Sequence, residues 1–201
     1  MKTKSLILLL FFTSPVFFWQ IQNKTYLNFR SQIQNIPAFT TAKVTSLLSP
    51  QTIDNIKEYR RDLKNPLSRI FYNKATAIFP QAFHYLNILK PRVYFQSGTG
   101  TADFPSRTEP LPLLLIPFVL LGFFYHIKKQ KYRPLILFTL SPFLAFITGQ
   151  YNFLFLLPGI FAYLYFSAVG INLNPHSKKI IALYLIYALF LSISNFLTYE
   201  A

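Results

Sequence analysis

The sequence contains no cysteine among its 201 residues. Disulfide bonds, thiolate metal ligands and cysteine nucleophiles are therefore excluded, because each of them needs a thiol. The redox compartment stays open, since a chain without thiols is compatible with either kind. Any chemistry or metal binding would have to come from other side chains.

Negative charge is the next scarcity. Six Asp and Glu residues stand against twenty Lys and Arg, which gives a formal net charge of +14. Charged residues make up 13% of the chain, about half of the ~25% that is usual in a soluble domain. So basic a chain can bind nucleic acid, but here the basic residues lie between apolar runs rather than along one solvated face. Nucleic acid is not an expected partner, and the composition indicates a membrane protein.

Long runs without any charged residue carry this signal. Four runs have no charged residue, and the third of them is 44 residues long. As a helix it would measure about 66 Å, which is enough for two crossings of a ~30 Å hydrocarbon core. Its polar break at Thr148–Asn152 predicts a tight turn between them, and the earlier of the two helices is short and contains Pro142. We expect an all-α integral membrane protein with about five transmembrane helices and an extracytoplasmic helical segment. The four runs are Ser5–Asn23, Pro110–Ile127, Pro134–Ser177 and Ile180–Tyr199.

The first run admits two interpretations. Lys2 and Lys4 supply the basic region of a cleaved signal peptide. No small-x-small cleavage pattern follows, and Phe18–Gln20 occupies the place where one would stand. The sequence therefore favours an uncleaved signal anchor. The predicted division of the chain is a signal-anchor helix over residues 1–23, an extracytoplasmic helical segment over 24–109 and a four-helix transmembrane region over 110–201.

Basic residues set the expected orientation. With five helices, the clusters all fall on one side of the membrane, and the uncharged turn near Gln150 falls on the other. Because short cytoplasmic loops carry an excess of Lys and Arg, we expect a multi-pass protein of the cell membrane with its amino terminus in the cytoplasm and its carboxyl terminus outside. The clusters are Lys2 and Lys4, then Lys128, Lys129, Lys131 and Arg133, then Lys178 and Lys179.

The segment expected outside has helical patterns of its own. Apolar residues recur at a helical period over 53–63 and again over 67–89. Pro80 should kink or divide the second helix, and Pro91 should end it. Such a basic, aromatic helix beside a membrane either lies in the headgroup interface or packs within a small outer domain. Both alternatives stay open.

The residues that could carry chemistry are few. Asp54, Glu58 and Asp62 are spaced four apart, so one helix face would hold all three. Two such carboxylates could act as acid and base, or the group could bind a divalent cation. The interleaved basic residues favour instead a solvated face with local ion pairs. The three histidines are far apart and form no metal-ligand spacing or catalytic triad, so we expect no metal and no cofactor. They are His84, His126 and His176.

A small polar run, "SGTG" at Ser97–Gly100, precedes the second membrane run. It is not a nucleotide loop, because no Lys-Ser or Lys-Thr follows on a helix and no strand-and-helix context surrounds it. Its glycines suit a turn towards the membrane. Lys90, Arg92 and Arg107 flank this run and could contact a phosphate, although the position of these residues near a membrane favours unspecific contact with lipid headgroups.

Part of the chain resembles a known superfamily. The stretches "YNK" at 72–74, "HYLNILKPRVYFQSGTG" at 84–100 and "LPLLLIPFVLLGFFYHIKKQKYRPLILFTLSPFLAFITG" at 111–149 resemble the rear half of GT-C membrane glycosyltransferases. The similar group is that of the protein mannosyltransferases and aminoarabinose transferases. The resemblance implies an outer loop that leads into membrane helices and a polyprenyl-phosphate-linked sugar as the lipid partner.

One departure from that family shapes the functional expectation. The resemblance places a catalytic acidic residue in the first outer loop, but residues 21–39 contain no Asp or Glu, and the first carboxylate is Asp54. The chain is therefore expected to be a non-catalytic or accessory module that meets membrane lipid and a membrane protein partner. The alternatives are an active transferase with Asp54, Glu58 or Asp103 as its acid, and a structural subunit of a membrane complex.

Overall fold

The computed structural model describes residues 2–47, 54, 81–96 and 109–199. All regular secondary structure in those ranges is helical, which confirms the all-α expectation. Residues 81–89 form one helix. The other elements, in chain order, are α1 (Thr3–Phe12), α2 (Pro15–Gln22), η1 (Thr25–Asn28), α3 (Phe29–Gln34), α4 (Ile36–Leu47), α7 (Pro91–Phe95), η2 (Leu113–Leu115), α8 (Ile116–Lys128), α9 (Tyr132–Leu140), α10 (Phe143–Thr148), α11 (Phe153–Leu173) and α12 (Ser177–Tyr199).

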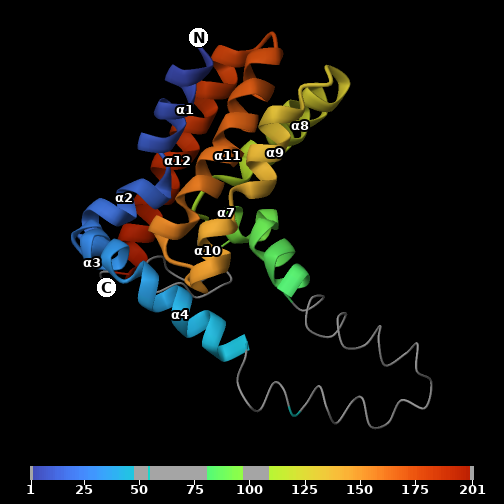
Figure 1. Cartoon of the computed structure of the whole chain (residues 1–201). Helices are drawn as coiled ribbons and strands as arrows, with labels where there is room; N and C mark the ends of the chain where they lie inside the picture. Colours follow the sequence, from blue (N-terminus) through green and yellow to red (C-terminus); the bar gives the residue numbers. More distant parts are fainter. Residues whose placement is uncertain (1, 48–53, 55–80, 97–108, 200–201) are drawn as a thin grey trace.

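Helix α11 is the centre of a bundle. Helices α1, α8, α9 and α12 run alongside it, and α4 crosses one end (Figure 1). Within their most apolar stretches, 61% of α11 is buried by protein but only 11% of α12. Protein therefore surrounds α11, whereas α12 turns most of its apolar surface outward, as a helix in contact with lipid would.

Helices occupy all of the apolar runs, but fewer of them are long enough to cross a membrane than the five expected. Two of them, α11 and α12, meet that criterion by length and composition. The pair α1 and α2, which is bent by 48° at its break, would be a third if it forms one span. The remaining two expected crossings appear as shorter apolar helices, Leu113–Lys128 and the broken pair within Tyr132–Thr148.

The breaks have a common cause. At Ser14–Pro15 and again at Ser141–Pro142 a proline removes a backbone donor, so the preceding helix stops. The two serine hydroxyls donate to the carbonyls three residues earlier, at 2.6 Å for Ser14 and 2.7 Å for Ser141. The same carbonyls also accept from the backbone N–H groups of Ser14 and Ser141, at 3.0 Å and 3.2 Å. Each serine thus bonds twice to the carbonyl that an uninterrupted helix would pair with the residue at the proline position, which is one way in which broken helices are tolerated away from water.

The turn predicted at Thr148–Asn152 is confirmed. Helix α10 ends at Thr148, and Gly149 adopts a left-handed conformation with φ 66°. Asn152 then caps α11, since its side chain accepts from the Phe155 N–H at 3.2 Å. Two helices are consequently joined by a turn of only four residues at one end of the bundle.

The three basic clusters beside the apolar runs lie at one end of the bundle. The amino terminus, the α8–α9 turn and the α11–α12 turn lie together there (Figure 1). We call this the basic end, and we call the end with α4 and the α10–α11 turn the opposite end. The fold thus groups the clusters as the sequence predicts. They are Lys2 and Lys4, then Lys128, Lys129, Lys131 and Arg133, then Lys178 and Lys179.

The contact between α8 and α11 depends on two glycines that face each other's helix. A Cβ on Gly122 would lie 2.1 Å from the Phe166 carbonyl oxygen, and a Cβ on Gly170 would lie 2.0 Å from that of Phe118. The backbones therefore touch at both points, and no larger residue fits at either. Small residues that let helices approach closely are the usual means of helix association in membranes.

This contact makes Gly122→Val a destabilising change even though valine is the better helix former. The added side chain must push α8 away from the α11 backbone, at a cost of about 1–3 kcal/mol. Thermal unfolding in detergent measures it, with Leu121→Val, on the half-exposed neighbouring position, as the matched control. An unchanged midpoint for the glycine variant would contradict the close contact.

Candidate functional site

Residues 81–96, which belong to the segment expected outside the membrane, reach into the bundle. The helix over 81–89 lies beside α10, and its residue His84 contacts Tyr151 in the α10–α11 turn (Figure 1). It ends where the Tyr163 hydroxyl donates to the Leu89 carbonyl at 2.6 Å. Tyr163 is the middle residue of α11, about 15 Å from either end of that helix. The sequence predicts this segment on the outer side, either in the headgroup interface or in a small outer domain.

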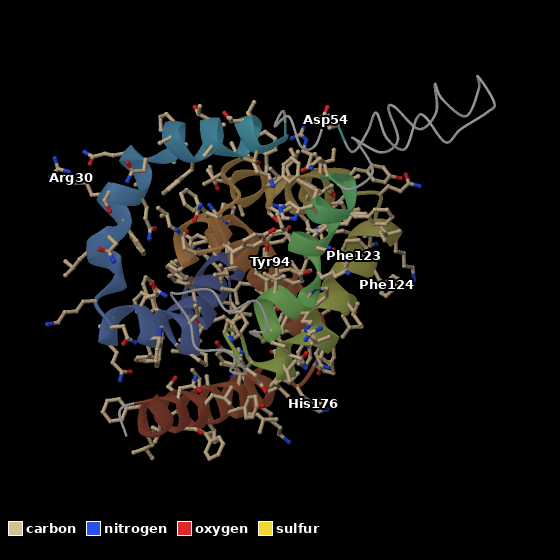
Figure 2. All side chains as sticks on the ribbon, turned by 90° about the horizontal axis from the view of Figure 1, so that it is seen from below. Arg30, Asp54, Tyr94, Phe123, Phe124 and His176 are labelled. Atoms are coloured by element: carbon tan, nitrogen blue, oxygen red, sulfur yellow. The ribbon has the colours of Figure 1, made fainter. Side chains whose placement is uncertain are left out.

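Helix α7 follows at this depth and is held by two aromatic side chains. Pro91 ends the 81–89 helix as predicted, and it also opens α7 as an early helical residue. Tyr94 and Phe95 are buried, with ring centroids 4.7 Å and 5.3 Å from that of Tyr163. Figure 2 shows Tyr94 at the centre of the bundle when the molecule is viewed along its axis.

A glycine on α11 makes room for this anchor. A Cβ on Gly159 would lie 2.2 Å from the Tyr94 hydroxyl oxygen, so any larger residue would displace the ring. The Tyr94 carbonyl also accepts from the Leu111 N–H at 3.0 Å. Helix α7 is thus fixed between the middle of α11 and the residues that lead into α8.

Of the three residues predicted to contact a phosphate, the structure describes two. Lys90 and Arg92 belong to α7 and its first flanking residue, and both are exposed. Arg107 and the run Ser97–Gly100 lie outside the described residues. The structure therefore joins two of the three predicted basic residues on one short helix whose opposite face is buried.

The position of these two cations constrains what can surround them. They flank the Leu89 carbonyl, which the side chain of Tyr163 reaches from the middle residue of α11. A charged side chain facing hydrocarbon at the middle of a membrane costs about 2.5–3.5 kcal/mol. If α11 crosses a membrane, Lys90 and Arg92 need water or an anion wherever they face its apolar core, and polar groups at such positions commonly mark a functional site.

Glu109 is an acidic group at a similar depth that the sequence did not single out. Its carboxylate accepts from the Leu113 N–H at 3.0 Å and from the Tyr187 hydroxyl at 3.1 Å and 3.2 Å. Tyr187 lies next to the middle of α12. Sequence reasoning could not pair Glu109 with a tyrosine 78 residues further along the chain, although one acidic residue directly before an apolar run was a usable signal.

The acidic triplet of the sequence is only partly described. Asp54 is exposed at the opposite end of the molecule (Figure 2), while Glu58, Asp62 and Asp103 lie outside the described residues. Within the described ranges, no group of three or more His, Asp or Glu side chains could hold a metal ion.

The histidines take separate places, as their spacing predicts. His84 packs against Tyr151 in the α10–α11 turn, with its Nε2 2.7 Å from the tyrosine hydroxyl. Phe146 lies beside the His84 ring, at a centroid distance of 6.0 Å. His126 and His176 belong to the basic end. His84 therefore fastens the 81–89 helix to the opposite end of the bundle.

Comparison of the chain with protein-family models, with curated proteins and with solved structures finds no match in any of the three. The geometry just described is therefore the basis on which function has to be argued.

The attachment of the 81–89 helix should weaken in acid. Burial, and secondly the charge of Lys43, lower the pKa of His84 from its ordinary value of 6.5. The packed state therefore favours the neutral ring, so its stabilisation is present above pH 6.5 and is lost as the pH falls below that value towards the lowered pKa. Hydrogen exchange of residues 81–89 in detergent, corrected for the intrinsic rate, should show less protection at pH 5 than at pH 7.5.

The control for this prediction is His84→Gln, which keeps a hydrogen-bonding side chain but does not titrate. Its protection should be the same at both pH values. If the unaltered protein were equally protected at pH 5 and pH 7.5, the histidine contact would not be what holds this helix.

Proposed function

We propose that the chain is a multi-pass membrane protein that binds the phosphate of a polyprenyl-phosphate-type lipid at Lys90 and Arg92 and acts as an accessory module rather than as an enzyme. The observation that supports this most strongly is the placement of α7. Its buried aromatic face fixes two exposed cations beside α11. Such cations need an anion or water.

A lipid phosphate meets this need better than a soluble anion. Arginine binds phosphate oxygens with two parallel hydrogen bonds, and lysine adds a point charge. The polyprenyl tail of such a lipid can stay in the hydrocarbon beside the bundle while its phosphate contacts the two cations. The apolar and the charged part of the ligand would then each meet a matching part of the site. Arg107, which belongs to the same sequence segment, would add a third cation in this proposal.

The proposed topology has five crossings, of which α11 and α12 are continuous. The other three are the bent pair α1–α2, the segment from η2 through α8, and the broken pair α9–α10. The gathering of the basic clusters at one end supports this arrangement, because basic residues favour the cytoplasmic side. We accordingly assign the amino terminus to the cytoplasm and the carboxyl terminus to the outside.

The resemblance to GT-C transferases supports the same proposal from the sequence. The similar stretches at 84–100 and 111–149 include the segment that enters the bundle and the helices α8, α9 and α10. A chain that resembles only the rear half of such an enzyme, without an acid in its first outer loop, fits an accessory role towards the lipid-linked sugar.

A specific observation favours an active transferase as the second candidate. Glu109 is a carboxylate inside the bundle, two residues from the Leu111 that bonds to α7. Turnover of a polyprenyl-phosphate-linked sugar in membranes distinguishes the two candidates. Turnover that is lost in Glu109→Gln would establish the enzyme with Glu109 as its acid, and turnover lost only on alanine substitution of Asp54, Glu58 or Asp103 would assign one of those instead.

The lipid proposal is tested by the double change Lys90→Gln and Arg92→Gln. Each lost charge-assisted contact is worth about 1.5–3 kcal/mol, so retention of polyprenyl phosphate should fall by at least about tenfold per residue. Native mass spectrometry of protein released from phosphatidylcholine nanodiscs doped with polyprenyl phosphate measures it.

The matched control is Lys128→Gln with Lys129→Gln, which removes the same charge at the basic end. It should leave retention of polyprenyl phosphate unchanged. Equal losses in both double variants would show that net charge alone attracts the lipid, and undiminished retention in the Lys90 and Arg92 variant would exclude this site.

A further inference from the structure

A second cavity lies at the basic end, away from the site on α7. It has a volume of about 770 Å³ and is formed by the α8–α9 turn, the start of α9 and the last turns of α11. Its walls are mostly polar or aromatic. The residues on which the argument depends are His126, Lys131, Tyr132, Arg133 and Tyr165.

Two side chains close the inner wall of this cavity. His126 is 3% exposed, and its Nδ1 lies 2.8 Å from the Gly122 carbonyl oxygen, which can only accept, so that nitrogen carries the hydrogen. In the neutral ring, Nε2 then accepts from the Tyr165 hydroxyl at 3.0 Å. The wall is therefore fixed by its own hydrogen bonds, and the positive charge of the cavity comes from its mouth.

Lys131 and Arg133 supply that charge at the start of α9. Gln130 adopts a left-handed conformation with φ 54°, which reverses the chain, and the Lys131 N–H bonds to the His126 carbonyl at 2.9 Å. The first turn of α9 contains no acidic residue, although the amino end of a helix favours negative charge. Two cations and the amino-terminal residues of a helix thus line one cavity, and an anion there would be stabilised by all three.

An apolar cavity of about 520 Å³ adjoins the polar one and shares Pro134 and Tyr165 with it. It lies between α9 and α11, and most of its lining is aliphatic or aromatic, including Phe138, Phe161 and Ala162. A cavity with two cations at the end of the bundle therefore lies next to an apolar groove along the bundle. This is the shape and chemistry of a single amphiphile with an anionic head.

We propose that an anionic phospholipid from the leaflet at the basic end occupies both cavities. Its phosphate group lies against Lys131 and Arg133, and one acyl chain lies in the groove between α9 and α11. This site lies at the basic end, apart from the α7 site, and it binds a different ligand. The proposal therefore does not depend on the α7 site. Charge complementarity selects an anionic head over a zwitterionic one, and the groove selects a lipid over free phosphate.

The test uses the whole protein in nanodiscs of phosphatidylcholine with phosphatidylglycerol, and native mass spectrometry counts the retained lipids of each kind. Lys131→Gln with Arg133→Gln should lower retention of phosphatidylglycerol by at least about tenfold. The matched control, Lys178→Gln with Lys179→Gln, removes equal charge at the same end but outside the cavity lining, and should retain the lipid. Equal losses in the two variants would overturn the proposal in favour of unspecific surface attraction.

A second variant tests the acyl chain independently of charge. Ala162→Leu fills the groove and should also reduce retention of phosphatidylglycerol by at least about tenfold, whereas Lys90→Gln with Arg92→Gln should leave it unchanged. Full retention in Ala162→Leu would overturn the assignment of the groove, and competition by inorganic phosphate alone would show that the cavity takes free anions. Thermal unfolding of each variant in detergent confirms that a loss of lipid is not a loss of fold.

Discussion

The close contact between α8 and α11 is the constraint on which the rest of the structure depends. Gly122 and Gly170 let the two backbones touch, and in a membrane this dispersion contact takes the place of the hydrophobic effect as the force between helices. Because α8 and α11 are held in this way, α11 becomes the centre on which the other elements pack. Its remaining surface then receives α1 and, through Gly159 and Tyr163, the short helix α7.

A second feature of the bundle is a layer of helix breaks half-way along it. Helix α1 stops at Ser14–Pro15 and α9 stops at Ser141–Pro142, each about 15 Å from the basic end by helix length. The Val16 N–H donates to the Pro110 carbonyl at 3.1 Å, and Glu109 meets Tyr187 at the same level. Broken backbone and polar side chains are tolerated at such depth only where protein or a polar cavity surrounds them. In our proposal, the two exposed cations of α7 bind a phosphate beside this layer.

Much of the fold was predictable from the sequence because its main signal is local. Apolar runs without charge specify helices wherever they occur, and Thr148–Asn152 was recognisable as a turn since only its residues interrupt a long apolar run. Pro142 was also recognised as a weakness in its helix. The matching break at Ser14–Pro15 was missed, because the composition of that run alone suggests one continuous crossing.

The candidate site could be predicted only in part, since its contacts join residues that are distant in sequence. Lys90 and Arg92 were chosen for their charge near an apparent turn, but nothing local shows that Tyr94 and Phe95 pull them to the middle of the bundle. Tyr163 and Tyr187 look like ordinary apolar-run tyrosines until the fold brings them to Leu89 and Glu109. The basic-end cavity was equally hidden, because its charges and its apolar groove come from different helices.

The central claim is that the chain spans the membrane with its basic end inside while α7 remains reachable from outside at mid-depth. The absence of cysteine allows a direct measurement, since single cysteines at 92, 130 and 186 can be labelled one at a time with a membrane-impermeant maleimide in intact and permeabilised cells. The account predicts labelling of position 92 in intact cells, labelling of position 130 only after permeabilisation, and no labelling at 186, where Ile186 is exposed on α12 and faces lipid. Labelling of position 130 in intact cells, or of position 92 only after permeabilisation, would contradict it.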